Sequence, residues 1–290
     1  MNNQPRLYSR KECRYADLQG VHITQLKELR RSPKHYQHRL AHGRKQTLAL
    51  EIGNAAHVAC LEPERFLTDF ALWRSEGDDG KKKVRRGSAW EDFQAANEGK
   101  VIIRDEEYEH AIALRDAVRS DDVAMRYLAV GRPEVSLTWT DAHSGVPCVG
   151  RLDWETKVDG YPAIVDLKTT RNAGPTFFQR DVARLDYHLQ LAFYADGYEA
   201  ITGKLPRVVI VAVESEAPHD VVTYIVPADV LEIARDQYRQ LLEAFRDCSA
   251  RGEWLGQGGG GELTLRLPAW AVPDDDDTAD LGLTGWKDAG

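Results

Sequence analysis

The chain has 290 residues, of which 42% are hydrophobic and 29% charged, a composition typical of a soluble globular protein. It contains no apolar run close to the roughly 20 residues that a membrane span requires, and its first residues do not resemble a signal peptide. The four cysteines are scattered and form no C-x-x-C pair. We therefore expect a cytoplasmic protein with reduced thiols and no membrane partner.

The net charge of −8 is unevenly distributed along the chain. Residues 1–100 contain 19 Lys and Arg against 13 Asp and Glu, whereas the remaining residues contain 19 against 33. Proteins that bind phosphate groups usually carry a basic patch, and the first hundred residues could supply one. The acidic total therefore does not exclude a nucleic acid as the substrate.

The N-terminal part predicts helices with a basic surface. Residues 1–20 are polar, and we expect a flexible segment there. A helical pattern follows over residues 21–42, where Thr24 is placed to cap the first helix and Pro33 to begin a second. Small residues dominate a further helical pattern over residues 48–61.

The remaining elements predict a domain of mixed helices and strands. Residues 75–99 are rich in glycine and charge, which favours a mobile loop, and an amphipathic helix follows over residues 105–129. Strand patterns then cover residues 135–140, 147–154, 163–168, 207–214 and 221–226, and helical patterns cover 187–201 and 228–250. This order predicts a single α/β (α+β) domain over residues 21–271, with a central mixed β-sheet of about five strands flanked by helices. An acidic, disordered tail is expected over residues 272–290.

Turn geometry places two aspartates opposite each other on adjacent strands. Asp159-Gly160 is a strong signal for a two-residue hairpin turn, and the register that it sets pairs Asp153 with Asp166. Lys168 lies on the same face as Asp166, because side chains two residues apart in a strand share a face. A four-residue loop in the preceding hairpin would place Glu134 opposite Asp153 in the same way.

Three carboxylates and a lysine on one patch predict a metal site. Opposed carboxylates destabilise a sheet unless a positive group lies between them. Hard oxygen ligands suit Mg²⁺, for which Mn²⁺ can substitute, and a neighbouring lysine could orient or deprotonate an attacking water. The alternative interpretation is a surface ion pair between Asp166 and Lys168, with Asp153 nearby by chance.

Five motifs in order resemble the PD-(D/E)xK nuclease superfamily. Gly150-Arg-Leu-Asp153 followed by Val165-Asp166-Leu-Lys168-Thr-Thr resembles its core signature. Gly53-Asn-Ala-Ala-His57 and Gln190-Leu-Ala-Phe-Tyr194 resemble the flanking motifs of RecB-type nucleases. The closest resemblance is to the exonuclease VIII (RecE-type) branch, also found in prophages, through Ile23-Thr-Gln-Leu-Lys, Ser32-Pro-Lys-His-Tyr36, Leu61-Glu-Pro-Glu-Arg-Phe66 and Leu267-Pro-Ala-Trp-Ala271.

The resemblance implies both an activity and a set of site residues. The activity would be Mg²⁺-dependent hydrolysis of linear double-stranded DNA from its ends, 5′ to 3′, in recombination. The enzyme would be a homo-oligomeric ring, a trimer or tetramer, that works beside a single-strand annealing protein. Asp153, Asp166, His57 and Glu134 would bind the metal, and Lys168 would be the catalytic lysine. Gln190 and Tyr194 would line the active-site channel, and Thr169 and Thr170 would contact the DNA backbone.

Some of these residues also allow simpler interpretations. His57 could be a packed histidine, and Gln190 and Tyr194 could pack in the core. The basic run of Lys81, Lys82, Lys83, Arg85 and Arg86 could contact DNA or form a solvated loop.

Three other functional classes share parts of this pattern. An iron–sulfur exonuclease would need three clustered cysteines downstream of the core, where only Cys248 occurs, so we expect no iron–sulfur cluster. A non-catalytic DNA-end-binding or assembly protein should have lost one of the core residues, which are all present here. A related endonuclease is the third alternative, although no added recognition domain is evident.

Overall fold

The computed structural model describes residues 5–43, 48–74, 84–268 and 271 of the chain. Its contacts separate two units, Met1–Trp254 and Leu255–Gly290, and the described helices and strands lie in the first unit. The domain predicted over residues 21–271 therefore extends beyond that compact unit. The predictions for Lys81, Lys82, Lys83 and the tail over residues 272–290 fall outside the described residues.

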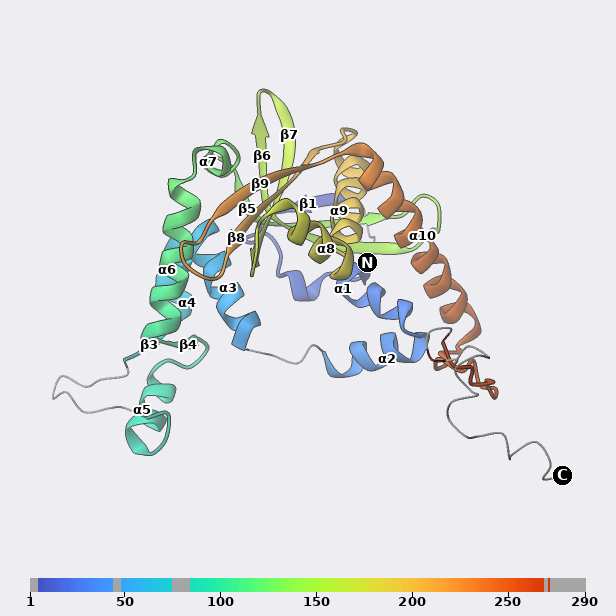
Figure 1. Ribbon diagram of the computed structural model, residues 1–290, viewed down its shortest axis with the longest axis horizontal. Helices are drawn as coiled ribbons and strands as arrows, with labels where there is room; N and C mark the ends of the chain where they lie inside the picture. The colour runs from blue at the N-terminus through green and yellow to red at the C-terminus, as the bar shows by residue number, and fades with distance from the viewer. Residues whose placement is uncertain (1–4, 44–47, 75–83, 269–270, 272–290) are drawn as a thin grey trace, which may run out of the picture. The chain divides into compact units, whose positions relative to one another are not determined.

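A mixed β-sheet forms the centre of the first unit (Figure 1). The described strands follow the spatial order β1-β5-β6-β7-β8-β9, and β2 pairs with β6. Their bounds are β1 (Arg6–Tyr8), β2 (Val21–His22), β5 (Arg132–Thr140), β6 (Pro147–Val158), β7 (Tyr161–Thr170), β8 (Arg207–Glu214) and β9 (Val221–Val226). Neighbouring strands from β5 to β9 are antiparallel except for the parallel pair β7–β8. The mixed sheet is confirmed, with its five long strands where the sequence predicted them.

The N-terminal segment is more regular than predicted. β1 pairs antiparallel with β5, from Arg6 opposite Thr138 to Tyr8 opposite Ser136. The turn after β1 is closed by Glu12, whose carboxylate accepts hydrogen bonds from both the backbone N–H and the hydroxyl of Ser9, each at 2.7 Å. A strand of three residues is too short to show alternation in the sequence. Its stability comes from pairing with β5, which the sequence pattern of the segment does not reveal.

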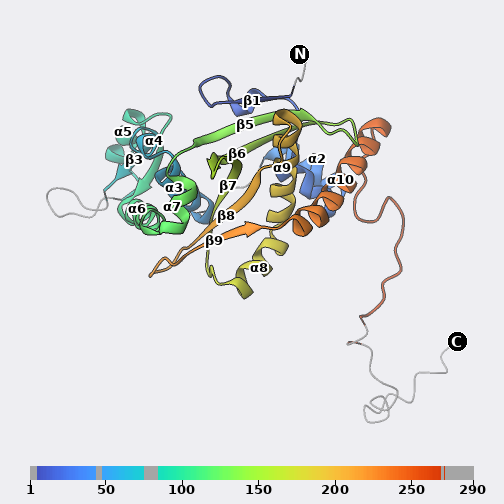
Figure 2. The same ribbon diagram turned by 90° about the horizontal axis from the view of Figure 1, so that it is seen from above.

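Helices cover both faces of the sheet (Figure 2). β8 shows why, since Val208, Ile210 and Ala212 join one hydrophobic cluster and alternate residues of the same strand join another. The first cluster contains residues of α1 (Ile23–Leu26), α9 (Tyr187–Thr202) and α10 (Ala228–Arg251). The second contains residues of α3 (Leu48–Leu61), α6 (Asp105–Ser120) and α7 (Asp122–Leu128). A strand that is buried on both faces reads as a continuous apolar run, as this one does.

Smaller elements complete the first unit. They are η1 (Tyr15–Asp17), η2 (Lys27–Arg30), α2 (Pro33–His42), α4 (Pro63–Asp69), α5 (Ser88–Ala96), α8 (Pro175–Arg184) and a separate parallel pair, β3 (Phe70–Trp73) with β4 (Val101–Arg104). Thr24 lies inside α1 and does not cap it, because that helix follows β2 directly, with His22 at the N-cap position. Pro33 begins α2 as predicted, and the Ser32 hydroxyl caps this helix by accepting a hydrogen bond from the His35 N–H.

Two predictions in the middle of the chain need correction. The helix predicted over residues 105–129 is two helices, because Asp121 leaves the helical conformation and its carboxylate caps α7 at the Ala124 N–H, 2.7 Å away. The loop predicted over residues 75–99 contains α5 in its described part. Among the described residues, no helix combines the length and the apolarity that crossing a membrane would demand.

The hairpin between β6 and β7 has the predicted register. Val158 faces Tyr161 across Asp159 and Gly160, which both have positive φ angles, as a type I′ turn requires. Pairing continues in this register as far as Trp154 and Val165. Asp153 and Asp166 lie one step beyond this last pair, so the two carboxylates stand where the ladder ends.

The register between β5 and β6 is also the predicted one. Paired residues run from Thr140–Pro147 to Arg132–Glu155, with one gap in the ladder at Glu134. Glu134 has a φ of 53°, a left-handed conformation that is uncommon for a residue other than glycine. The third predicted carboxylate therefore also lies at an irregularity of the sheet.

Candidate active site

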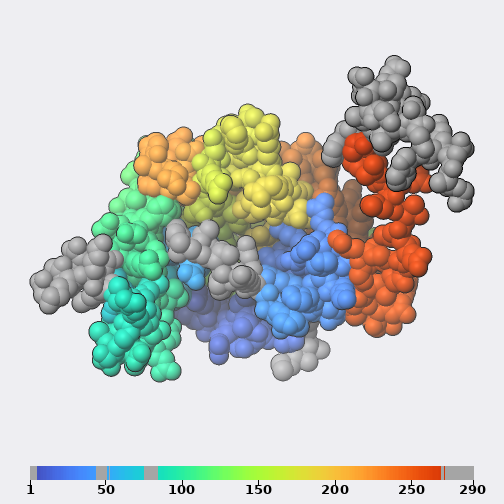
Figure 3. Space-filling model, turned by 60° about the horizontal axis from the view of Figure 1, so that its bottom comes forward, coloured from blue at the N-terminus to red at the C-terminus, as the bar shows by residue number. Residues whose placement is uncertain are grey.

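The described structure brings six of the predicted site residues into one cleft. The cleft has a volume of about 600 Å³ and lies between the N-terminal helices, α3, β7 and the start of α9. In Figure 3 the blue α2 and the yellow α8–α9 segment lie beside each other on the face that is drawn, and α2 and α9 both contribute residues to the cleft. The predicted residues that line the cleft are His57, Glu134, Asp153, Lys168, Thr169 and Gln190.

His57 forms a cluster with two carboxylates. Its Nε2 lies 2.9 Å from Asp153 Oδ2, and its Nδ1 lies 4.0 Å from Glu134 Oε1. The helix α3 positions the imidazole because its small residues Ala55 and Ala59 are fully buried on other sides. His57 therefore lines the cleft beside two carboxylates, which favours its interpretation as a site residue over that of a packed core histidine.

The electrostatics of this cluster favour a charged pair. Burial alone would lower the pKa of His57, but the Asp153 and Glu134 carboxylates raise it above its usual value. Burial would raise the pKa of Asp153, but His57, Lys168 and the hydrogen bond from the Leu167 N–H hold it well below its usual range. Asp153 is thus ionised and available as a ligand near neutral pH.

Asp166 and Lys168 form a buried pair on β7. Lys168 Nζ lies 2.6 Å from Asp166 Oδ2, and the two side chains are only 17% and 5% exposed. Gln190 on α9 donates a hydrogen bond to the other oxygen, Asp166 Oδ1, at 3.2 Å. A surface ion pair would leave both side chains in water, so that alternative interpretation of the D-x-K pattern is wrong.

The pKa values of both members of this pair are raised. Burial, together with the nearby Asp153, raises the pKa of Asp166 to about 6, although Lys168 opposes the shift. Burial would lower the pKa of Lys168, but Asp166 and Asp153 raise it above its ordinary value. Lys168 therefore holds its proton in this arrangement, which favours orientation and charge stabilisation over removal of a proton from water.

The donor set fits a divalent cation. His57, Glu134 and Asp153 each offer one ligand atom, and the three atoms lie within 4.8 Å of one another. Oδ2 of Asp166 is buried and accepts no hydrogen bond from the described residues, and it forms the ion pair with Lys168. Carboxylate oxygens with one imidazole suit Mg²⁺ or Mn²⁺, and no cysteine belongs to the cluster.

Several predicted residues lie outside the cleft. Tyr194 is only 6% exposed, and its ring packs against Gly150 of β6. Thr170 is buried, and its hydroxyl donates to the Asn172 carbonyl oxygen. Arg85 pairs with Glu107 and stacks over the Trp90 ring, whereas Arg86 is exposed.

Sequence reasoning missed four residues that belong to the site. Arg151 and Arg10 contact Glu134, Lys27 lines the cleft, and the Tyr187 ring lies 4.9 Å from Lys168 Nζ. The strand register could have revealed Arg151, because it lies two residues before Asp153 on the same strand. No signal in the sequence connects Arg10 to residues more than a hundred positions away.

The fold and the cleft together define a protein of the PD-(D/E)xK nuclease superfamily, as the motifs predicted. More particularly, a model of the family described as "PDDEXK-like domain of unknown function (DUF3799)" matches residues 22–264, and the chain belongs to this family. No curated protein matches the sequence significantly.

Solved structures support the assignment of the fold. The crystal structure of a protein from Eubacterium rectale, named provisionally as an exonuclease, is 16% identical with a TM-score of 0.58. The match covers 96% of this chain and 98% of that chain. The structure of SSO0001 is 15% identical, and the match covers 77% of this chain and 88% of that chain with a TM-score of 0.27.

Proposed function

We propose that the protein is a Mg²⁺-dependent deoxyribonuclease that hydrolyses phosphodiester bonds from the ends of linear double-stranded DNA. The observation that carries this proposal is the buried Asp166–Lys168 pair together with the cluster of His57, Glu134 and Asp153. Lys168 and all three members of the cluster line one cleft. A non-catalytic protein on the same fold would have no need to keep five ionisable groups together in a largely buried site, where charged groups are costly.

Each side chain has a role that follows from its contacts. His57, Glu134, Asp153 and Asp166 would hold the cation, which when bound polarises a phosphoryl oxygen and lowers the pKa of water. The Lys168 ammonium can orient the attacking water and stabilise negative charge that develops on the phosphoryl group. Gln190 holds Asp166 in place, and the Tyr187 ring limits the directions in which Lys168 can point.

The surroundings of the cleft suit a polyanion. Lys27 and Arg39 line it beside the catalytic groups. Burial lowers the pKa of Lys27 to about 8, an effect that Asp186 partly offsets, so this lysine is largely charged at neutral pH. Contacts from lysine and arginine to phosphates supply most of the affinity for DNA regardless of base sequence.

The finer parts of the proposal rest on the resemblance to exonuclease VIII. They are digestion from 5′ to 3′, a role in recombination, a homo-oligomeric ring and cooperation with a single-strand annealing protein. Light scattering coupled to size-exclusion chromatography should give the mass of a trimer or tetramer. A monomer at all concentrations would remove the ring from the proposal but leave the chemistry untouched.

The activity test uses 5′-phosphorylated linear duplex DNA labelled at either end, with Mg²⁺. We expect loss of linear DNA with release of the 5′ label first, while covalently closed circles survive. Lys168→Ala and Asp166→Ala should each reduce the rate by at least about a hundredfold, because both act at the reacting centre. Lys157→Ala is the matched control, since Lys157 is an exposed lysine on β6 that does not line the cleft.

The outcomes separate the candidate functions. Cleavage of closed circles would identify an endonuclease, and binding of ends without any cleavage would identify a non-catalytic protein. Circular dichroism should show that each variant is folded before its rate is interpreted. Full activity of a folded Lys168→Ala variant would refute the proposed mechanism.

A further inference from the structure

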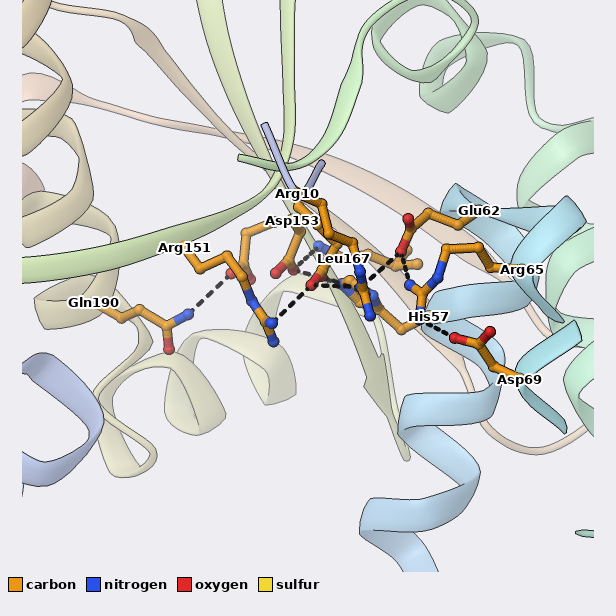
Figure 4. Close-up of polar contacts among 11 residues, drawn as sticks. Arg10, His57, Glu62, Arg65, Asp69, Arg151, Asp153, Leu167 and Gln190 are labelled. Carbon is orange, nitrogen blue, oxygen red and sulfur yellow. Dashed lines mark hydrogen bonds and ion pairs between the residues drawn. The ribbon is translucent and has the colours of Figure 1, made fainter. Parts of the chain in front are cut away.

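Glu134 is held by two arginines on one side of its carboxylate. Arg151 Nη1 lies 3.0 Å and Arg10 Nη1 lies 3.5 Å from the same oxygen, Oε2. The other oxygen, Oε1, is the one that faces His57, 4.0 Å from its Nδ1. Figure 4 shows Arg10 and Arg151 converging on the region of His57 and Asp153 from different parts of the chain.

Arg151 is itself held in place by the N-terminal segment. Its guanidinium lies over the Tyr15 ring, 4.7 Å from the centroid, a distance at which a cation and an aromatic ring attract each other. The Tyr15 hydroxyl in turn is 2.8 Å from His22 Nδ1. Arg10 also contacts Glu62, 3.4 Å away, so its guanidinium bridges two buried carboxylates.

The backbone at Glu134 is strained in a way that suits a functional residue. Its φ of 53° interrupts a ladder whose neighbouring pairs are regular. Such a conformation is unfavourable for a residue other than glycine and persists only where the surroundings hold it. Glu134 has only 9% of its side chain exposed, and both arginines form ion pairs with its carboxylate.

We propose that Arg10 and Arg151 are positioning residues that hold Oε2 of Glu134 and so present Oε1 to a cation beside His57 and Asp153. Residues outside the ligand set that orient a ligand commonly matter for metal affinity nearly as much as the ligands themselves. Arg10 and Tyr15 precede the family match, which begins at residue 22, so the N-terminal segment completes the metal site. The inference rests on the proposed function, since it assigns the cluster to a divalent cation.

The competing explanation is that the two arginines bind a DNA phosphate and touch Glu134 only in passing. Both side chains are partly exposed, at 46% for Arg10 and 40% for Arg151. That explanation predicts weaker DNA binding with unchanged metal affinity. If the arginines instead position Glu134, their removal should weaken metal binding even when no DNA is present.

The experiment is calorimetric titration of the full chain with Mn²⁺ alone, without DNA. We expect Arg151→Ala and Arg151→Lys each to weaken Mn²⁺ binding by about tenfold or more. Lysine keeps the charge but cannot donate to the carboxylate with the same planar geometry, so it should not rescue affinity. Tyr15→Leu should weaken binding several-fold, and Arg10→Ala should do the same.

Arg132→Ala is the matched control. Arg132 also pairs with a glutamate across β5 and β6, since its Nε donates to Glu155 at 2.6 Å, but neither residue lines the cleft. This variant should bind Mn²⁺ as the wild type does. Thermal unfolding followed by circular dichroism shows whether each variant is folded. If Arg151→Ala does not fold, the Mn²⁺ affinity of Tyr15→Leu serves as the test instead.

A double-variant cycle with Glu134→Ala decides between the two explanations. If the arginine acts through Glu134, Arg151→Ala should cause no further loss of Mn²⁺ affinity once Glu134 is absent. Unchanged or tighter Mn²⁺ binding in Arg151→Ala would overturn the inference, because the arginine would then only repel the cation or serve the DNA. Wild-type protein that binds Mn²⁺ but cleaves no DNA would instead defeat the proposed function and leave this inference standing.

Discussion

Two of the groups at the site are poised to hold a proton at mildly acidic pH. The carboxylates around His57 raise its pKa despite its burial, and burial raises the pKa of Asp166 to about 6. A cation needs both groups without their protons, so protons and metal compete for the same atoms. Metal affinity should therefore fall as the pH falls through this range.

We expect Mn²⁺ binding to weaken between about pH 7.5 and pH 5.5 and to release protons near pH 6.5. Titrations in two buffers with different heats of ionisation give the number of protons released. His57→Gln removes one titrating group, so it should release fewer protons at that pH. Equal proton release by the variant and the wild type would show that His57 does not carry the competing proton.

Single residues of the site were predictable where local geometry determines their neighbours. Asp153, Asp166 and Lys168 follow from one turn and the alternation of a strand, and the structure places them as that register implies. Arg10 and His57 reach the site through tertiary packing, which no local rule describes. The motif resemblance supplied His57 but gave no hint of Arg10.

At the scale of elements, the helix α9 lies close against the sheet because two glycines remove the side chains between them. A Cβ on Gly150 would lie 2.9 Å from the Tyr194 ring, and one on Gly197 would lie 2.8 Å from the Trp139 ring. Both distances are shorter than atoms in contact allow. The close approach matters for the site, because α9 also carries Gln190 to Asp166.

Gly150→Ala should therefore lower the free energy of unfolding by about 1–3 kcal/mol, the usual effect of excess volume in a packed core. Urea denaturation followed by circular dichroism gives the value. The double variant with Tyr194→Ala should lose less than the sum of the single losses, since the smaller side chain makes room for the added methyl group. Simple additivity would show that the two residues do not meet.

Elements were predictable when their pattern was long and regular. The run over β8 and the turn at Asp159-Gly160 fixed the centre of the sheet. The break between α6 and α7 depends on a single capping aspartate, Asp121, within an otherwise continuous helical pattern. The short strands β1, β2, β3 and β4 form only because a partner strand is present, so their sequences carry little signal.

At the scale of the whole molecule, the acidic total hides a basic N-terminal part. Lys27 and Arg39 line the cleft, and Arg31 and Lys34 are exposed on the same short segment of chain. Cations on this segment can follow a DNA backbone that enters the cleft. If DNA contacts the first hundred residues, we expect it to contact the surface formed by this segment.

Arg31→Ala/Lys34→Ala should weaken binding of duplex DNA in the absence of divalent metal. It should also reduce the slope of affinity against salt by up to about 2, because each phosphate contact contributes about 0.9 to that slope. Fluorescence anisotropy at several salt concentrations measures both quantities. The control variant Arg126→Ala/Lys157→Ala removes the same charge near the β6–β7 turn and should change neither the DNA affinity nor the salt slope. Equal losses of affinity in the two double variants would show that only the net charge matters.

The position of His57 on α3 has a mechanical consequence. Several apolar residues of α3 pack into hydrophobic clusters, whereas His57 contacts Glu134 of β5 and Asp153 of β6. A cation held by all three would fasten α3 to β5 and β6 by coordinate bonds. At a free concentration one hundred times its dissociation constant, such a ligand stabilises the folded state by about 2.7 kcal/mol. A bound ion would then also stabilise the contact between α3 and the sheet, and a chelator that removes the ion would lower that stability.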